Sequence, residues 1–411
     1  MIKSKDRKDR KDRKDRDSTF NEPLFRSPFY DFFAAQETEG HWYNWNGYKS
    51  PTILSDEELE YFSIRSTCSI FDISPLNKYR IAGPQAEDFL NKLTVRNVAK
   101  QNVATVRYTL WCDQEGFVID DGTLFRISDN EFRLCSQEKH LPWLIDTSHG
   151  FDVEIIDETK NICGVSLQGP TSASILRLLG IKGIDNLKPF HILQTKLTNI
   201  PIMISRTGFT GDLGYEIFMK NNAANKVIEK VWNAGADYGL TAIGYNALNM
   251  ARIEAGFIVA NIDFISSDHA IRPNRCRRPE DLGLGWLVDL NKGFFNGRKA
   301  IVNSKKENGT ASKIYALEID GKEPVEGSII YYNKKEEVGT VTSAIWSPMA
   351  KKSIALAQLE LGSTNSIMDN LWVEIYALKE LQYYKLMKKV TVVKPPFINL
   401  ARRSACPPVN Y

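Results

Sequence analysis

The stretch Ile204-Ser-Arg-Thr-Gly-Phe-Thr-Gly-Asp-Leu-Gly-Tyr-Glu-Ile-Phe218 places three evenly spaced glycines between two apolar runs. Both runs are rich in strand-forming residues, so the stretch predicts two strands joined by a loop that contains Gly208, Gly211 and Gly214. Glycine permits a positive φ and lets another group come close to the backbone. One carboxylate, Glu216, follows the last glycine. Two interpretations remain open: a hairpin with an outward polar residue, or a loop that closes over a flat ligand while Glu216 accepts two hydrogen bonds from it.

Length and composition indicate a globular protein with more than one domain. A chain of 411 residues is longer than one hydrophobic core usually serves, and 43% hydrophobic with 25% charged residues is typical of folded proteins. The net charge is +3, but residues 1–17 hold nine Lys/Arg and five Asp, so the remaining chain is close to −1. We therefore expect no nucleic-acid partner, because the basic excess belongs to one end of the chain.

The N-terminal segment repeats Lys-Asp-Arg up to Asp17 and holds no apolar residue within the repeat. Such a segment cannot bury a face, so we expect residues 1–19 to form a disordered charged tail. It lacks the apolar centre of a secretory signal, and no apolar run in the chain approaches membrane-spanning length. Six scattered cysteines without a CxxC pair and five dispersed histidines predict reduced thiols, a cytoplasmic location, and neither a metal site nor a membrane partner.

Two segments resemble each other and suggest an internal duplication. Tyr79-Arg-Ile-Ala-Gly-Pro84 and Gly164-Val-Ser-Leu-Gln-Gly-Pro170 are each followed by a run with apolar residues at helical spacing. Both predict a strand, a Gly-Pro step and a helix, because proline is pre-organised for the first helical turn. We expect two similar α+β units within residues 60–240.

A second hairpin is predicted between these segments, with strand 106–112, turn 113–116 and strand 117–127. Alternation divides its second strand into two faces: Ile119, Asp121, Thr123 and Phe125 on one, and Val118 and Asp120 on the other. At least one of the paired acids is expected to be partly desolvated, which raises the pKa of a carboxyl and suits proton handling. The alternative is a solvent-facing Asp-Asp-Gly bend.

The other predicted elements flank these units. Aromatic residues are dense between 25 and 48 and predict core packing or the wall of a pocket. We expect helices at 56–66, with Ser55 as N-cap, at 222–235 and at 244–256. Arg252 and Glu254, two positions apart, should diverge around the last of these helices. Beyond a linker at 305–310, short strands with turn signals predict a small β-barrel: 314–319, 328–332, 337–342, 354–359 and 371–375.

In order along the chain, these motifs resemble the aminomethyltransferase (glycine-cleavage T-protein) family of tetrahydrofolate-dependent enzymes. The resemblance covers roughly residues 25–398 and rests on the following segments: Phe71-Asp-Ile-Ser, Gly83-Pro84, Tyr108-Thr-Leu, Gly116 with Asp120-Asp121, Leu167-Gln-Gly-Pro170, Arg206-Thr-Gly-Phe-Thr-Gly, Arg252-Ile-Glu-Ala-Gly256, Gly283-Leu-Gly-Trp286, Gly339-Thr-Val-Thr-Ser343, Trp346-Ser-Pro348 and Pro396-Phe397.

The resemblance implies an α+β, three-domain cloverleaf fold that holds folate in a central channel and ends in a small β-barrel domain. It divides the chain into the tail at 1–19, a folate-binding catalytic region of two intertwined α+β domains at 20–305, the barrel at 306–400 and a tail at 401–411. It also implies site residues. Asp121 is the expected catalytic residue and approaches the reacting end of tetrahydrofolate. Tyr108 and Phe209 are expected folate contacts, and Glu216 is expected to hold the amino-pyrimidine edge of the pterin.

Several positions depart from the family pattern. Pro75-Leu76 replaces a His-Met pair, Leu248 replaces an arginine that helps bind folate, and Trp42–Pro51 replaces an Ala-Gly-Trp segment. These departures fit a relative that transfers a one-carbon group from a small methylated amine, sulfonium or methoxy compound to tetrahydrofolate. They fit less well a glycine-cleavage enzyme acting on a lipoyl carrier protein. The loop Lys292-Gly-Phe-Phe-Asn-Gly-Arg298 lacks the cysteine that marks the family's iron–sulfur assembly proteins. Two further alternatives are a non-catalytic folate-binding or regulatory protein and a fold-mate that binds no folate.

Overall fold

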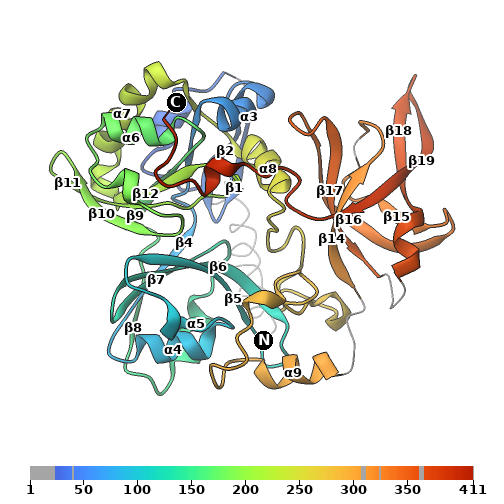
Figure 1. The fold of residues 1–411 in the computed structure, drawn as a ribbon, viewed down its shortest axis with the longest axis horizontal. Coiled ribbons are helices and arrows are strands. Elements are labelled where there is room, and N and C mark those ends of the chain that lie inside the picture. The colour runs from blue at the N-terminus through green and yellow to red at the C-terminus, as the bar shows by residue number, and fades with distance from the viewer. Residues whose placement is uncertain (1–23, 39–40, 307–311, 324, 361–364, 411) are drawn as a thin grey trace, which may run out of the picture.

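In a computed structural model of the chain, the described residues are 24–38, 41–306, 312–323, 325–360 and 365–410. The predicted disordered tail at 1–19 and most of the predicted linker at 305–310 lie outside these ranges. The chain forms two α+β units and a closed barrel, with helix α8 (Tyr245–Glu254) between the second unit and the barrel (Figure 1). This arrangement confirms the predicted fold class.

The first unit has a five-stranded sheet in the order β5-β6-β7-β4-β8. Its elements are β4 (Asn77–Ala82), α4 (Ala86–Leu93), η1 (Val98–Lys100), β5 (Thr105–Cys112), β6 (Val118–Ser128), β7 (Glu131–Ser136), α5 (Leu141–Ser148) and β8 (Glu154–Asp157). Helices α4 and α5 pack on one face of the sheet around a core that includes Phe89, Trp111 and Leu144. The hairpin predicted at 106–127 is therefore formed by β5 and β6.

The second unit has a six-stranded sheet in the order β10-β11-β12-β9-β3-β13. Its elements are β3 (Cys68–Asp72), β9 (Ile162–Gln168), α6 (Ser172–Leu178), η2 (Ile184–Asn186), β10 (Ile192–Leu197), β11 (Ile200–Ser205), β12 (Gly214–Lys220), η3 (Asn221–Ala223), α7 (Ala224–Gly235), η4 (Ala236–Tyr238) and β13 (Leu240–Ala242). Helices α6 and α7 cover one face, with Ile175 and Val227 in the core.

The two units repeat one topology, which confirms the predicted duplication. The order β5-β6-β7-β4-β8 corresponds to β10-β11-β12-β9-β3, with β3 in the place of β8. Gly83 and Gly169 occupy matching points with φ of +142° and +132°. A Cβ would meet the Asp152 carbonyl oxygen at 2.5 Å in the first case and that of Thr67 at 2.5 Å in the second. Each carbonyl belongs to the residues that lead into the neighbouring strand, so glycine is required at both turns.

Further elements flank these two units. They are α2 (Tyr30–Ala34), β1 (His41–Trp45), β2 (Tyr48–Ile53), α3 (Glu57–Ser66), η5 (Pro273–Arg275), η6 (Gly285–Leu287) and α9 (Arg298–Lys306). The helix-free faces of the two sheets meet in a central cluster. Phe125 of β6 contacts Phe218 of β12 with ring centroids 5.7 Å apart, and Ala247 of α8 packs against the same cluster.

The C-terminal unit is a closed barrel in the order β14-β17-β16-β15-β18-β19. Its elements are β14 (Lys313–Ile319), β15 (Ile329–Tyr332), β16 (Glu336–Ser347), β17 (Lys352–Leu359), η7 (Asn365–Asn370), β18 (Leu371–Lys379) and β19 (Gln382–Val393). The barrel and five of its strands are as predicted. The sixth, β19, is not among the predicted strands, because its lysine-rich sequence carries a weak apolar alternation.

Two local predictions are wrong. The N-cap of α3 is Asp56, not Ser55, because the Asp56 carboxylate accepts a hydrogen bond from the Leu59 backbone N–H at 2.9 Å. The predicted faces of β6 also fail at its start. The register shifts between Trp111 and Cys112, and such a bulge reverses the alternation that follows it. Ile119 consequently packs in the helix-side core.

The C-terminal segment, red in Figure 1, runs from the barrel back to the second unit. It includes η8 (Ala401–Arg403). The Arg402 guanidinium contacts Asp212 at 2.6 Å, and Arg206 donates to the Ala405 carbonyl oxygen at 2.6 Å. The described part of the expected tail at 401–411 is thus packed on the glycine-rich loop. Across the described ranges, none of the helices is long and apolar enough to cross a bilayer.

Candidate functional site

Asp120 and Asp121 are separated by the pleat of β6. Asp120 pairs with Trp111, whose side chain lies in the helix-side core, whereas Asp121 pairs with Leu110. The Asp120 carboxylate is fully buried, lies 2.8 Å from Nε2 of His140 and accepts a hydrogen bond from the Asp121 backbone N–H at 2.8 Å. Asp120 therefore holds the strand and the following helix in place, and Asp121 faces the centre of the molecule.

Asp121 is a desolvated acid beside Tyr108. Burial, reinforced by the charge of Asp120, raises the pKa of Asp121 to about 8, while hydrogen bonding with Tyr108 and the backbone lowers it. Burial and then the charge of Asp121 raise the pKa of Tyr108 well above its usual value. The expectation that at least one of the paired acids is partly desolvated is confirmed. A carboxyl group in this state can take up or release a proton near neutral pH.

Glu216 faces the same central region from the opposite sheet. Its neighbours Tyr215 and Ile217 pack toward α6 and α7, so Glu216 projects from the other face of β12. Its Oε2 accepts hydrogen bonds from the hydroxyl of Thr207 at 2.5 Å and of Ser205 at 3.5 Å.

Oε1 of Glu216 has no hydrogen-bond donor among the described residues. Burial raises the pKa of this carboxyl group, and the two hydroxyls lower it. A partly buried carboxylate with one oxygen unused has the capacity to accept N–H groups from a ligand. These features fit the amino-pyrimidine edge of a pterin.

The glycine-rich loop contains a fixed side-chain amide. Gln168 crosses it, donating to the Thr207 carbonyl oxygen at 3.2 Å and accepting from the Thr210 hydroxyl at 2.8 Å. A Cβ at Gly208 or Gly214 would lie 2.1–2.2 Å from this amide. These two glycines therefore make room for Gln168. The first of the two interpretations, a hairpin, holds for β11 and β12, while Glu216 is not an outward residue.

Phe209 lies at the tip of this loop and stacks on Phe257, which follows α8. The ring centroids are 5.4 Å apart and the planes differ by 23°. Phe209 also packs against the central cluster that contains Leu248. The position where the family pattern has an arginine thus holds an apolar contact.

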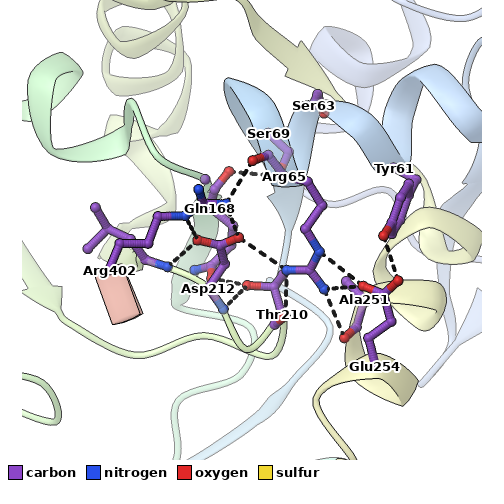
Figure 2. A network of polar contacts seen from close by, with 12 residues as sticks. Tyr61, Ser63, Arg65, Ser69, Gln168, Thr210, Asp212, Ala251, Glu254 and Arg402 are labelled. Atoms are coloured by element: carbon purple, nitrogen blue, oxygen red, sulfur yellow. Dashed lines mark hydrogen bonds and ion pairs between the residues drawn. The ribbon is translucent and has the colours of Figure 1, made fainter. Parts of the chain in front are cut away.

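A buried ionic network fixes the loop relative to α3 and α8 (Figure 2). Arg65 of α3 contacts Glu254 at 2.6 Å and Asp212 at 3.2 Å, with the three side chains almost inaccessible to solvent. Glu254 also accepts from the Tyr61 hydroxyl at 2.5 Å and from Ser347 of the barrel at 2.5 Å. Sequence reasoning did not identify this network, because its members come from distant segments.

Arg252 makes a separate buried pair with Asp263 at 2.6 Å. The predicted divergence of Arg252 and Glu254 around the helix is confirmed. Asp263 also accepts from the Ser343 hydroxyl of the barrel at 2.6 Å, and its charge contributes to the raised pKa of Asp121. Asp263 lies in a loop without a recognisable motif, so the sequence carried no signal for it.

Rings from the aromatic N-terminal segment reach the same region. Tyr43 contacts Tyr245 of α8 with centroids 5.2 Å apart, and Trp45 contacts Phe71 at 5.8 Å. A pocket of about 250 Å³ lies elsewhere, beside Phe25, and none of the predicted site residues lines it. No group of His, Cys, Asp and Glu that could hold a metal ion occurs among the residues that the structure describes.

Comparison with known proteins identifies the family. The model of the GCVT N-terminal domain matches residues 32–292. The model of the glycine cleavage T-protein C-terminal barrel domain matches residues 313–399. The chain belongs to the glycine-cleavage T-protein family. Members of this family transfer one-carbon groups with the use of tetrahydrofolate, and the chain is a transferase of that class.

T-protein relatives of two kinds are similar to the chain. An aminomethyltransferase of Halothermothrix orenii is 29% identical and covers 76% of the chain and 85% of the relative. A trimethylamine-oxide aldolase of Ruegeria pomeroyi is 32% identical over 74% of the chain but only 38% of the relative. The crystal structure of the glycine cleavage system aminomethyltransferase T of Bartonella henselae superposes with a TM-score of 0.79, 21% identity and coverage of 92% and 98%, which confirms the T-protein fold. The segment beyond residue 399 lies outside both family models.

Proposed function

We propose that the chain transfers a methyl or aminomethyl group from a small methylated substrate to tetrahydrofolate, with Asp121 as the catalytic residue. The observation that carries this proposal is the desolvated Asp121 carboxyl beside Tyr108, facing the central region that Glu216 faces from the other sheet. A non-catalytic folate-binding protein would need Glu216 to hold the cofactor but would not need the desolvated Asp121 carboxyl.

Four side chains would hold the cofactor. Glu216 accepts the amino-pyrimidine N–H groups through the oxygen that no described protein group uses. Phe209, which stacks on Phe257, would provide an aromatic surface, and Tyr108 would line the reacting end together with Asp121.

Tetrahydrofolate, when bound, would supply the ring nitrogen N5 that takes up the one-carbon unit, while the donor's nitrogen, sulfur or oxygen leaves with the electron pair of the broken bond. Asp121 accepts the proton that this nitrogen releases, and Tyr108 orients the carboxyl group for that transfer. The two sheets and α8 align the reactants, and good alignment can remove about 7–11 kcal/mol of an activation barrier.

The donor is a small compound whose one-carbon group is attached to a cationic nitrogen or sulfur or to a methoxy oxygen. Tyr43 and Tyr245 supply aromatic faces near the Arg252–Asp263 pair. A cation over such a face gains roughly 0.5–2 kcal/mol. The similarity to a trimethylamine-oxide aldolase supports a methylated amine as the first compound to test.

One alternative is glycine cleavage on a lipoyl carrier protein, which the names of the aminomethyltransferase relatives favour. The experiment that separates the two incubates the purified protein and tetrahydrofolate with methylated amines, sulfonium compounds and methoxy-aromatics. Mass spectrometry then measures methyl- and methylene-tetrahydrofolate. A parallel sample receives an aminomethylated lipoyl carrier protein. One-carbon folate from a small donor supports the proposal, whereas product from the carrier sample alone contradicts it.

Six free cysteines fit the proposed cytoplasmic location.

A further inference from the structure

The hairpin of β18 and β19 extends beyond the rest of the barrel as a two-stranded ribbon (Figure 1). Among the described residues, β15 pairs with β18 only at residues 371–373, and β14 pairs with β19 only at residues 390–393. Residues 374–388, which we call the β18–β19 ribbon, therefore have no neighbouring described strand on either side. A ribbon of two strands is marginally stable on its own in water, so a surface that covers this ribbon would stabilise it.

One face of the ribbon and its turn expose large apolar side chains. Leu378 pairs with Tyr383, so their side chains lie on one face, and Tyr376 lies on that face two residues earlier. The exposed fractions are 59% for Tyr376, 59% for Leu378, 72% for Tyr383 and 93% for Leu381 at the turn. Ile375 on the opposite face is buried in the barrel core. Neighbouring apolar side chains exposed in this way mark a surface that contacts a partner.

The turn of the ribbon keeps a leucine against its local preference. Glu380 and Leu381 have φ of +50° and +65°, a region in which bulky side chains are rare. Two-residue turns with positive φ at both positions favour Asn-Gly. Because Leu381 is almost fully exposed, it adds little to the packing of the barrel. A role in binding therefore explains this leucine better than a role in folding.

The ribbon and the end of β19 are basic. Between residues 374 and 394 the chain holds five lysines and two glutamates, a net charge of +3. Lys385 contacts Glu374 at 2.6 Å, whereas Lys389 makes no ion pair among the described residues. This charge opposes the pairing of two copies of the ribbon and favours an anionic surface.

The order of side chains along the ribbon matches the layers of a membrane surface. Leu381 is farthest from the barrel, Leu378 and Tyr383 come next, and Lys389 lies at the barrel end. Tyrosine is enriched at membrane interfaces, and lysines near the surface are attracted to anionic headgroups. The cores of protein–protein interfaces, in contrast, are poor in lysine. Glu380 at the turn limits the contact to the headgroup level, because a carboxylate in hydrocarbon is costly.

We propose that the β18–β19 ribbon binds the surface of membranes that contain anionic lipids, with Leu378, Leu381 and Tyr383 at the headgroup level. This inference goes beyond the proposed function and does not depend on it. The expectation of no membrane partner rests on the lack of an apolar run of spanning length, and a contact at the surface needs no such run.

The test measures binding of the full chain to sucrose-loaded vesicles by sedimentation. Mixed vesicles of phosphatidylcholine and phosphatidylglycerol in equal parts are compared with vesicles of phosphatidylcholine alone. The variants are Leu381→Ser and Lys389→Gln. Their matched controls, Ile271→Ser and Lys226→Gln, replace exposed residues outside the ribbon, and Ile271 is 97% exposed.

We expect the wild type to bind the mixed vesicles and to bind pure phosphatidylcholine much more weakly, because only the mixed vesicles attract the lysines. Leu381→Ser should weaken binding about tenfold, the effect of leaving one leucine unburied. Lys389→Gln should weaken it about fivefold, and rising salt should weaken wild-type binding. Both controls should bind as the wild type does.

Two outcomes of this experiment overturn the inference directly. One is a wild type that does not bind the mixed vesicles. The other is binding that Leu381→Ser and Lys389→Gln leave unchanged, because another part of the chain, such as the basic residues 1–17, then makes the contact.

A second copy of the chain is the occupant that sedimentation velocity without vesicles distinguishes. If the wild type forms a dimer that Leu381→Ser abolishes, and neither protein binds vesicles, the ribbon pairs with a second copy and the inference is overturned.

A measurement on the wild type alone covers the case in which a variant does not fold. Hydrogen exchange followed by mass spectrometry should become slower at residues 374–388 when mixed vesicles are added, and should not change in the loop at 266–279. Unchanged exchange at residues 374–388 would contradict the proposal without any substitution.

Discussion

At the scale of single residues, neighbouring acids on one strand have opposite tasks. Asp120 is buried against His140 and stabilises the fold, whereas Asp121 faces the central region and is the proposed proton acceptor. The pleat of the strand separates the two side chains, so Asp121 can be altered without removing the contact between Asp120 and His140.

Asp121→Asn should lower turnover by about 100-fold or more, because it removes a proton acceptor. Tetrahydrofolate binding should change little, since the amide keeps the size and much of the hydrogen bonding. The measurements are kcat with the best small donor and the folate dissociation constant. Asp120→Asn should instead lower the melting temperature, because it weakens the buried contact with His140. Unchanged turnover in Asp121→Asn would overturn the catalytic assignment.

The raised pKa of Asp121 predicts two pH effects. As a proton acceptor, Asp121 must be ionised, so kcat/KM should rise with pH around a pKa of about 8, and Asp121→Asn should lack this rise.

A raised pKa of the Asp121 carboxyl means that the folded state prefers its protonated form. The protonated Asp121 carboxyl therefore makes its full contribution to the free energy of unfolding near pH 4, and this contribution is lost as the pH rises through about 8. Melting temperatures at pH 5 and pH 9 test this. The melting temperature of Asp121→Asn, compared with that of the wild type, should be higher at pH 9 than at pH 5.

Glu216→Gln should weaken tetrahydrofolate binding about tenfold or more, because a charged acceptor of two N–H groups becomes a neutral amide whose NH2 group replaces one acceptor oxygen with a donor. The matched control is Glu229→Gln on the exposed face of α7, which should bind as the wild type does. Equal affinities for the wild type and Glu216→Gln would remove Glu216 from the cofactor site.

At the scale of elements, the duplicated Gly-Pro turns explain how one topology is built twice. Each turn brings the backbone so close to the entrance of a neighbouring strand that a side chain cannot fit. The glycine also has a φ that other residues rarely adopt.

Gly83→Ala and Gly169→Ala should each lower the free energy of unfolding by more than about 1 kcal/mol, because strain and overpacking add. Gly180→Ala is the control: its φ is +73°, but no atom lies within 4 Å of the added Cβ. Urea unfolding gives the three values. A loss for Gly180→Ala as large as for the other two would show that space at the turns is not the cause.

At the scale of the whole molecule, α8 joins the units. Through Arg252 it reaches Asp263 and Ser343, and through Glu254 it reaches Arg65 and Ser347. Two neighbouring charges on one helix thus connect the second unit, the central region and the barrel.

Glu254→Gln should destabilise the protein by about 3 kcal/mol, the lower end of the usual cost of breaking a buried ion pair, because Arg65 loses its shorter contact and keeps only Asp212. Glu318→Gln removes a partly exposed partner of Lys352 and should cost no more than about 1 kcal/mol. Chemical unfolding followed by tryptophan fluorescence compares the two. Equal effects would mean that the network does not hold the units together.

The sequence alone determined the elements and the family. Alternation and turn residues predicted the β5–β6 hairpin and most of the barrel, and the repeated Gly-Pro step predicted the duplication, because these signals are local. Only the tertiary structure decided which of the paired acids faces the central region, that Gln168 occupies the glycine-rich loop, and that Asp263 contributes to the raised pKa of Asp121. The physical reason is that burial and contact between distant segments arise when the sheets, α8 and the C-terminal segment pack together, and no spacing along the chain records that packing.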